Sequence, residues 1–313
     1  RQENTLRLLG FELGEATLET SVLKMLREGV AGFYDPSEDR FYQVIQPAGK
    51  TAPEGVPEDM EGIFEFMTVL HEADHARQDT IVDLQKMAEE DPQNWDRQQA
   101  RDSVVEGEAC VIMTLGFLDR MGVPKEHWAT ALGRIGDAMQ AMMGEAPEGP
   151  RFLSESLVRA YGDGYAWCSA LYLKHGIAGM RLALLHPPRS MSEILGVPAW
   201  SEPKAPTACK IPLDGGHMGG FFWRIWLLDQ HVKDEAVDEL VAAFRGDRFW
   251  ICANTGGETL TWRVLFDSPG AAHRVAFELK PLLRDGMQAT AQGDTVEFTK
   301  STRIAPAQEA PGT

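Results

Sequence analysis

The chain has 313 residues, of which 43% are apolar and 25% are charged, and this composition is typical of a soluble globular protein with one large domain or two modest ones. Its formal net charge of −17 argues against nucleic acid or an anionic membrane as a partner, because both attract basic surfaces. No apolar run approaches about 18 residues, so we expect no transmembrane segment.

The cysteines and the first residue bear on the cellular compartment. The four cysteines are widely spaced and form no Cys-x-x-Cys pair, so the sequence is compatible with two disulfides or with none. They are Cys110, Cys168, Cys209 and Cys252. The chain begins with Arg1 rather than Met, and we expect that an upstream segment was removed, either as a signal peptide or by truncation.

The first part of the chain predicts two helices and a hairpin. Residues 4–29 show helical periodicity and predict two short helices separated near Gly10–Gly14. Residues 30–47, VAGFYDPSEDRFYQVIQP, alternate apolar and polar side chains around an acidic turn, which indicates a β-hairpin. Such a strand could pair with an extended peptide or serve only as structure. Residues 48–60, rich in proline, glycine and charge, predict a loop.

Residues 61–88 form the stretch around which we expect the rest of the chain to be organised. No glycine or proline interrupts residues 63–90, which favours a helix. His71 and His75 are four residues apart, so their imidazoles leave the same face of this helix one turn apart. With Glu72 beside them, this His-Glu-x-x-His spacing predicts a zinc hydrolase in which the histidines bind the metal and Glu72 activates water as the general base.

A third metal ligand is needed, and the next predicted helix, at residues 96–121, offers two candidates. Glu106 and Glu108 lie about 200° apart around a helix, so only one of them can face the metal. Helix geometry favours Glu106, while Glu108 would lie behind the site or on the surface. Asp102, one turn before Glu106, is a candidate for orienting a ligating histidine through its second ring nitrogen.

The remainder of the chain predicts a long helix, a long connection and a small mixed layer. Residues 151–180 have helical periodicity, whereas residues 181–218 are rich in proline and glycine and predict a loop that could wall or cover a cleft. Further elements are expected as helices at 219–231, 233–245 and 269–284 and strands at 248–255, 259–266 and 294–300, which form a ββαβ layer. Residues 301–313 are expected to be a disordered tail.

Two of these stretches, HEADHARQD (71–79) and EGEA (106–109), together resemble the gluzincins, the thermolysin- and aminopeptidase-type zinc metallopeptidases whose third ligand is a Glu in an Asn-Glu-Gly-x-Ala-like stretch. A closer resemblance is to an uncharacterised group of bacterial and archaeal gluzincin-like proteins. The other stretches shared with that group occur in the same order as GFYDP (32–36), YGDG (161–164), HPPRS (186–190) and GDR (246–248). The chain departs from the family at Ala73-Asp74, where Asp74 adds negative charge beside the motif.

The resemblance implies a mostly helical α+β fold. It places a gluzincin-like catalytic domain at residues 1–218 and C-terminal helices with the ββαβ layer at residues 219–300. It also implies one catalytic zinc ion, held by His71, His75 and Glu106, and hydrolysis of peptide bonds in a peptide or protein substrate.

Gluzincins also use a Tyr or His that donates a hydrogen bond to the oxyanion opposite the metal. Tyr161, at the head of YGDG, is the first candidate for this role, and Tyr165 and His217 are alternatives. A second interpretation is a zinc protein that no longer cleaves peptides and binds a peptide or protein partner in the same cleft. The resemblance favours an exported or cell-envelope protein.

Overall fold

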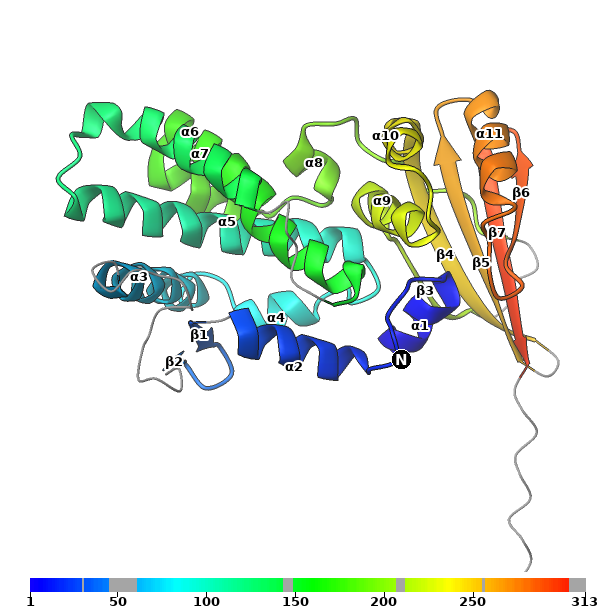
Figure 1. Cartoon of the computed structure of the whole chain (residues 1–313), viewed down its shortest axis with the longest axis horizontal. Coiled ribbons are helices and arrows are strands. Elements are labelled where there is room, and N and C mark those ends of the chain that lie inside the picture. Colours follow the sequence, from blue (N-terminus) through cyan, green and yellow to red (C-terminus); the bar gives the residue numbers. More distant parts are fainter. Residues whose placement is uncertain (30, 45–60, 143–148, 207–211, 255–256, 304–313) are drawn as a thin grey trace, which may run out of the picture. The chain divides into compact units, whose positions relative to one another are not determined.

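The computed structural model describes residues 1–29, 31–44, 61–142, 149–206, 212–254 and 257–303, and these form an α+β structure that is mostly helical, as predicted (Figure 1). The chain divides into two compact units. One, the sheet unit, comprises residues 1–12, 93–95 and 198–313, and the other, the helical unit, comprises residues 13–92 and 96–197. The predicted boundary at residue 218 does not coincide with this division, because the first helix and residues from 198 onward belong with the sheet.

The helical unit contains a two-stranded hairpin and seven of the described α-helices. The hairpin predicted at residues 30–47 is present as β1 (Gly32–Asp35) and β2 (Arg40–Gln43), which pair antiparallel with Tyr34 opposite Phe41. The helices are α2 (Leu18–Gly29), α3 (Glu61–Asp79), α4 (Leu84–Glu89), α5 (Trp95–Arg120), α6 (Trp128–Met142), α7 (Arg151–Leu185) and α8 (Met191–Leu195), with a short 3₁₀ turn at Lys125–His127.

The structure corrects the single helix predicted at residues 61–88. Helix α3 ends at Asp79, and α4 begins five residues later. The Asp79 carboxylate accepts a hydrogen bond from the Leu84 amide at 2.9 Å, and the Asp83 carboxylate caps α4 by accepting from the Lys86 amide at 2.8 Å. Both bonds satisfy amides that a continuous helix would have bonded internally, so the chain turns here.

Helices α5 and α7 cross with their backbones in contact at two glycines. A Cβ atom built on Gly107 would lie 2.3 Å from the backbone of Gly164, and one built on Gly164 would lie 2.0 Å from the Ser103 carbonyl oxygen. No side chain fits at either position, because real Cβ atoms do not approach other heavy atoms this closely. The two glycines therefore set how closely α7 approaches the middle of α5. Further along these two helices, an apolar core includes Val111 of α5 and Tyr165 of α7, together with Leu132 of α6.

The sheet unit is built on a five-stranded antiparallel sheet with the strand order β3-β4-β5-β7-β6. Helices α1, α9 and α11 contact its strands, and α10 packs on α9. The elements are α1 (Gln2–Leu9), β3 (Pro212–Gly216), α9 (Gly219–Asp229), α10 (Asp234–Ala242), β4 (Phe244–Asn254), β5 (Gly257–Phe266), α11 (Pro269–Leu279), β6 (Gln288–Gln292) and β7 (Thr295–Arg303). The predicted ββαβ layer is present as β4, β5, α11 and β7, extended by β3 and β6.

Aromatic rings fill the core of the sheet unit. Trp226, fully buried on α9, lies 5.2 Å from the rings of both Trp223 and Trp262 and 5.1 Å from Phe298, measured between ring centroids. Its indole nitrogen donates to the Leu9 carbonyl at 2.7 Å. This bond and the surrounding rings explain why the first residues of the chain belong to the sheet unit.

Parts of the predicted loops turn out to be structured. The loop predicted at 181–218 contains the end of α7, helix α8 and strand β3. Strand β7 continues to Arg303, so the predicted tail is ordered at its start, and residues 304–313 lie outside the described residues. In the described part of the chain, no helix has the length and apolar character needed to cross a membrane.

Candidate metal centre

Three predicted ligands meet between α3 and α5 of the helical unit. The Nε2 atoms of His71 and His75, one turn apart on α3, are 3.0 Å from each other. The Oε2 atom of Glu106, on α5, is 3.1 Å from His71 Nε2 and 3.5 Å from His75 Nε2. Three potential ligand atoms thus surround one point, and we call these three residues the metal centre.

The chemistry and spacing of the metal centre suit a zinc ion. Two imidazoles and one carboxylate are a donor set found in catalytic zinc sites, where three protein ligands leave one position open. Two donor atoms about 2.1 Å from a zinc ion at the tetrahedral angle lie about 3.4 Å apart. The separations of 3.0, 3.1 and 3.5 Å between the three atoms are close to that value, so these residues could hold one ion with little movement.

The charges of the metal centre are strongly coupled. Although burial alone would raise the pKa of Glu106, hydrogen bonds from His71 and His75 lower it well below its usual range. Burial would lower the pKa of His75, but the Glu106 carboxylate raises it to about 9. A proton on His75 thus compensates the buried carboxylate in the absence of a metal, and a cation that binds these atoms takes the place of that proton.

Glu108 faces away from the metal centre, into a buried polar cluster. Its carboxylate accepts from the Gln78 side-chain amide at 3.1 Å and forms an ion pair with Arg77 at 2.8 Å. Arg77 also pairs with Asp74 at 2.6 Å, so the acidic residue within the His-Glu-x-x-His motif is neutralised within this cluster. The structure therefore brings Glu106, and not Glu108, to the two histidines.

The second ring nitrogens of the histidines meet partners that the sequence analysis did not identify. His75 Nδ1 is 2.9 Å from the Gln78 side-chain oxygen, and the Gln78 amide nitrogen donates to the Val105 carbonyl of α5 at 2.9 Å. His71 Nδ1 lies 3.8 Å from the Cys110 sulfur. Among the described residues Asp102 makes no hydrogen bond to either imidazole, so the role predicted for Asp102 falls to Gln78.

Glu72 is held by the hairpin. One carboxylate oxygen of this buried residue accepts from the Tyr34 backbone amide of β1 at 2.8 Å. The Tyr34 hydroxyl donates to the Asp79 carboxylate at 2.9 Å. Tyr34 therefore binds α3 at two residues, Glu72 and Asp79. Burial raises the pKa of Glu72 above its ordinary value, although His71 and His75 act against this. Such a carboxylate binds a proton more readily than an exposed one does, as a general base requires.

Tyr161 is the predicted oxyanion donor that the structure places beside the metal centre. Its ring stacks on His71 with a centroid distance of 5.8 Å and an interplanar angle of 16°. Burial and a hydrogen bond to Glu106 raise its pKa well above the ordinary value, so the hydroxyl keeps its proton. Tyr165 instead lies in the core and donates to the Leu132 carbonyl at 3.2 Å. His217 belongs to the sheet unit, where its Nδ1 atom is hydrogen-bonded to the Asp247 backbone carbonyl.

Sequence reasoning missed Gln78, Asp79 and Tyr34 as supporting residues. All three lie inside stretches that the resemblance singled out, HEADHARQD and GFYDP. The motifs therefore pointed to these residues. Their hydrogen-bond partners, however, depend on side-chain geometry, which the spacing of residues along the sequence does not reveal.

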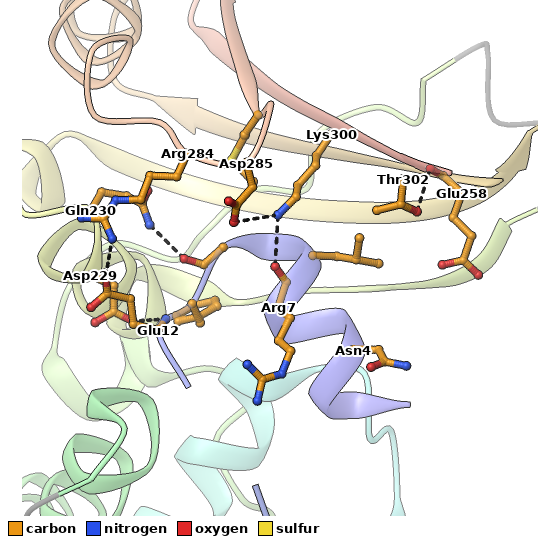
Figure 2. A pocket seen from close by; sticks show the side chains of 14 residues that line it. Asn4, Arg7, Glu12, Asp229, Gln230, Glu258, Arg284, Asp285, Lys300 and Thr302 are labelled. Carbon is orange, nitrogen blue, oxygen red and sulfur yellow. Dashed lines mark hydrogen bonds and ion pairs between the residues drawn. The ribbon is translucent and has the colours of Figure 1, made fainter. Parts of the chain in front are cut away.

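A cavity of about 590 Å³ lies in the sheet unit, away from the residues of the metal centre, among charged side chains that include residues of α1, α9 and the strands (Figure 2). Several of its charged side chains form ion pairs. Arg284 forms an ion pair with Glu12 at 2.5 Å, and the Lys300 ammonium lies 3.6 Å from the Asp285 carboxylate and 3.4 Å from the Arg7 carbonyl oxygen (Figure 2). The bond from Lys300 to the Arg7 carbonyl joins β7 to α1, and we assign this cavity no chemistry.

The cysteines differ between the two units. Cys110 and Cys168, in the helical unit, are buried free thiols. Cys252, on β4 of the sheet unit, takes part in a disulfide bond.

Comparison with known proteins identified no relative. No family model, no curated protein and no solved structure matches the chain.

Proposed function

We propose that the protein is a zinc-dependent peptidase. The observation that carries this proposal is the convergence of His71, His75 and Glu106 around one point, with the buried Glu72 adjacent in sequence to the first ligand. This donor set with a neighbouring carboxylate is the arrangement by which zinc hydrolases activate water. The resemblance of the motifs to gluzincins supports peptide bonds as the substrate class.

The protein residues around the metal centre have distinct roles in this proposal. A bound zinc ion supplies Lewis acidity, which polarises the scissile carbonyl and makes water more acidic. Glu72 takes the proton of the attacking water and passes it to the leaving amine. Tyr161, which keeps its proton, donates a hydrogen bond to the oxygen on which negative charge develops. Gln78 holds the His75 ring in one orientation.

The hairpin supplies a place for an extended substrate. Among the described strands, β1 pairs with β2 alone, and its Tyr34 amide donates to Glu72. A peptide that adds to the other edge of β1 would run beside the general base, as extended peptides do when they add to an exposed strand.

Cleavage of a mixed peptide library by zinc-loaded protein, read by mass spectrometry, tests the proposal. Wild-type protein is expected to cut, and Glu72→Gln is expected to retain zinc but to lose about 10² to 10⁴ of the rate. His71→Ala is expected to lose the zinc itself. Zinc-loaded wild-type protein that cuts no peptide, or cuts that persist in Glu72→Gln, would overturn the peptidase proposal.

The alternative is a zinc protein that binds a peptide or protein partner without cleaving it. The hydrogen bond between the Tyr34 amide and Glu72 favours this alternative, because it occupies one oxygen of the carboxylate that would act as base. Peptide binding that is equal in wild type and Glu72→Gln, with no cleavage by either, is the outcome that this alternative predicts.

We also propose that the protein is exported or resides in the cell envelope. The disulfide at Cys252 supports this, because disulfides persist in oxidising compartments. Detection of the protein in the envelope or medium fraction of the producing cell would test it, and confinement to the reducing cytosol would contradict it.

A further inference from the structure

A small pocket opens between α2, α5 and α7 of the helical unit, with a volume of about 250 Å³. This is below the range of about 300–1,000 Å³ usual for whole small-molecule ligands, and it suits one side chain. Most of its wall is apolar and comes from Val22, Met25, Leu153, Leu157 and Ala160.

The pocket adjoins the metal centre. Glu106 is both a predicted metal ligand and part of the pocket wall. Ala160, on the opposite wall, directly precedes Tyr161, whose ring stacks on His71. A side chain in this pocket would therefore belong to a substrate residue close to the scissile bond.

The ionisable groups of the described pocket wall are two carboxyl groups. Asp102 and Glu106 contribute carboxyl groups one helical turn apart, and none of the described residues that line the pocket is Lys, Arg or His. His71 and His75 compensate the charge of Glu106. Asp102 is exposed on the pocket wall and has no hydrogen-bond or ion-pair partner among the described residues, so its carboxyl group is accessible to a ligand. Desolvation by the pocket wall and the charge of Glu106 raise the pKa of Asp102 to about 7, against the opposite effect of Arg101, and a cationic ligand would stabilise its ionised form.

We propose that this pocket selects a substrate lysine or arginine side chain. The apolar wall covers the methylene stem, and Asp102 binds the cationic end, a combination that matches the amphipathic character of these two side chains. A free amino terminus offers the same charge but no stem to fill the apolar part of the pocket. The inference rests on the proposed peptidase, because it assigns the side-chain preference of the same site.

Binding measurements separate this preference from catalysis. Zinc-loaded Glu72→Gln protein is titrated by calorimetry with two acetylated peptides that differ only in one residue, lysine or norleucine, whose stems are alike. Acetylation leaves the side chain as the only cation. The lysine peptide is expected to bind about tenfold more tightly or better, as is typical of a charge-assisted hydrogen bond.

The variant Asp102→Asn, combined with Glu72→Gln, is expected to bind both peptides equally. Asp119→Asn, which removes an exposed carboxylate elsewhere on α5, is the matched control and is expected to keep the preference. The inference is overturned if norleucine binds as well as lysine, if neither peptide binds, or if the preference survives in Asp102→Asn.

Cleavage data distinguish the two proposals. If the wild type cuts the library without preference for lysine or arginine, the pocket assignment fails and the peptidase stands. If lysine-selective binding depends on Asp102 but no peptide is cut, the pocket assignment stands as a binding site and the peptidase fails.

Discussion

Each of the two units is stabilised internally, and the buried side chains at its centre differ from those of the other unit. The sheet unit is centred on Trp226, which is surrounded by other aromatic rings, and the burial of this apolar area stabilises its fold. In the helical unit, His75, Gln78 and Glu108 are buried at the centre, beside two helices that touch at glycines. Both units bury polar groups, but the buried Asp247 of the sheet unit accepts hydrogen bonds from Met218, Gly219 and Trp262 beneath an aromatic core, whereas the buried polar groups of the helical unit adjoin the metal centre. The comparison shows that burying polar groups serves packing in one unit and the candidate site in the other.

The largest expected effect on stability comes from the aromatic core. Trp226→Ala is expected to lower the free energy of unfolding by about 3–5 kcal/mol, because it removes a fully buried indole and leaves a cavity. Urea unfolding followed by circular dichroism measures the change. Phe277→Ala on α11, where the side chain is 81% exposed, is the control and should change the free energy little. Equal losses in both variants would contradict the packing assigned to Trp226.

The glycine contact in the helical unit gives the next largest effect. Gly164→Ala is expected to lower the free energy of unfolding by about 1–3 kcal/mol, because its Cβ has no room beside the Ser103 carbonyl. Gly133→Ala on α6 is the matched control, since a Cβ there meets no atom within 4 Å. The control should be neutral or slightly stabilising, as alanine is a better helix former than glycine. Calorimetric melting would decide, and a Gly164→Ala protein as stable as the control would refute the close contact.

A smaller effect, on zinc affinity, is expected from replacing Gln78, which is hydrogen-bonded to the ligand His75. Gln78→Leu leaves His75 Nδ1 without its partner and is expected to weaken zinc binding by about 10- to 100-fold. Competition with a chromogenic chelator measures the affinity. Gln85→Leu, an exposed position on α4, should bind zinc like the wild type. Unchanged affinity in Gln78→Leu would show that this hydrogen bond does not support the site.

The smallest effect is the pH dependence of the metal-free protein. The pKa of His75 is raised to about 9, above its value of about 6.5 in an unfolded chain, so the folded state binds the proton more tightly. This stabilisation is complete below pH about 6.5 and is lost as the pH rises through about 9. The free energy of unfolding in the presence of a chelator should fall by about 1 kcal/mol between pH 7 and pH 8.

Two controls sharpen that measurement. The variant His75→Ala should lack the decline, and zinc-saturated wild type should show the opposite trend, because protons compete less with the metal as the pH rises. A metal-free wild type whose stability is flat over this range would contradict the ion pair between His75 and Glu106.

Features that depend on repetition along the chain could be predicted from the sequence. The helical period put His71 and His75 on one face, and the angle around the next helix favoured Glu106 over Glu108, which matches their positions in the structure. The hairpin and the two N-terminal helices were also predicted, since turn residues separate clear apolar patterns.

Features that depend on individual side chains could not be predicted. Asp79 and Asp83 end α3 early by bonding backbone amides, which the apolar pattern does not reveal. The assignment of Asp102 failed because helix spacing does not say which group meets an imidazole. Strands β3 and β6 were missed because PLDGG and QATAQ contain few residues that favour strands.

The contact between Gly107 and Gly164 has a consequence for recognising related chains. The Glu-Gly sequence of α5 and the Tyr-x-x-Gly sequence of α7 can lie this close only if Gly107 and Gly164 both remain glycine. Drift elsewhere in a lineage could erase overall similarity and leave these spacings intact. A search for His-x-x-x-His, Glu-Gly and Tyr-x-x-Gly in this order would then find chains that share this helix contact, even where comparison of whole sequences does not.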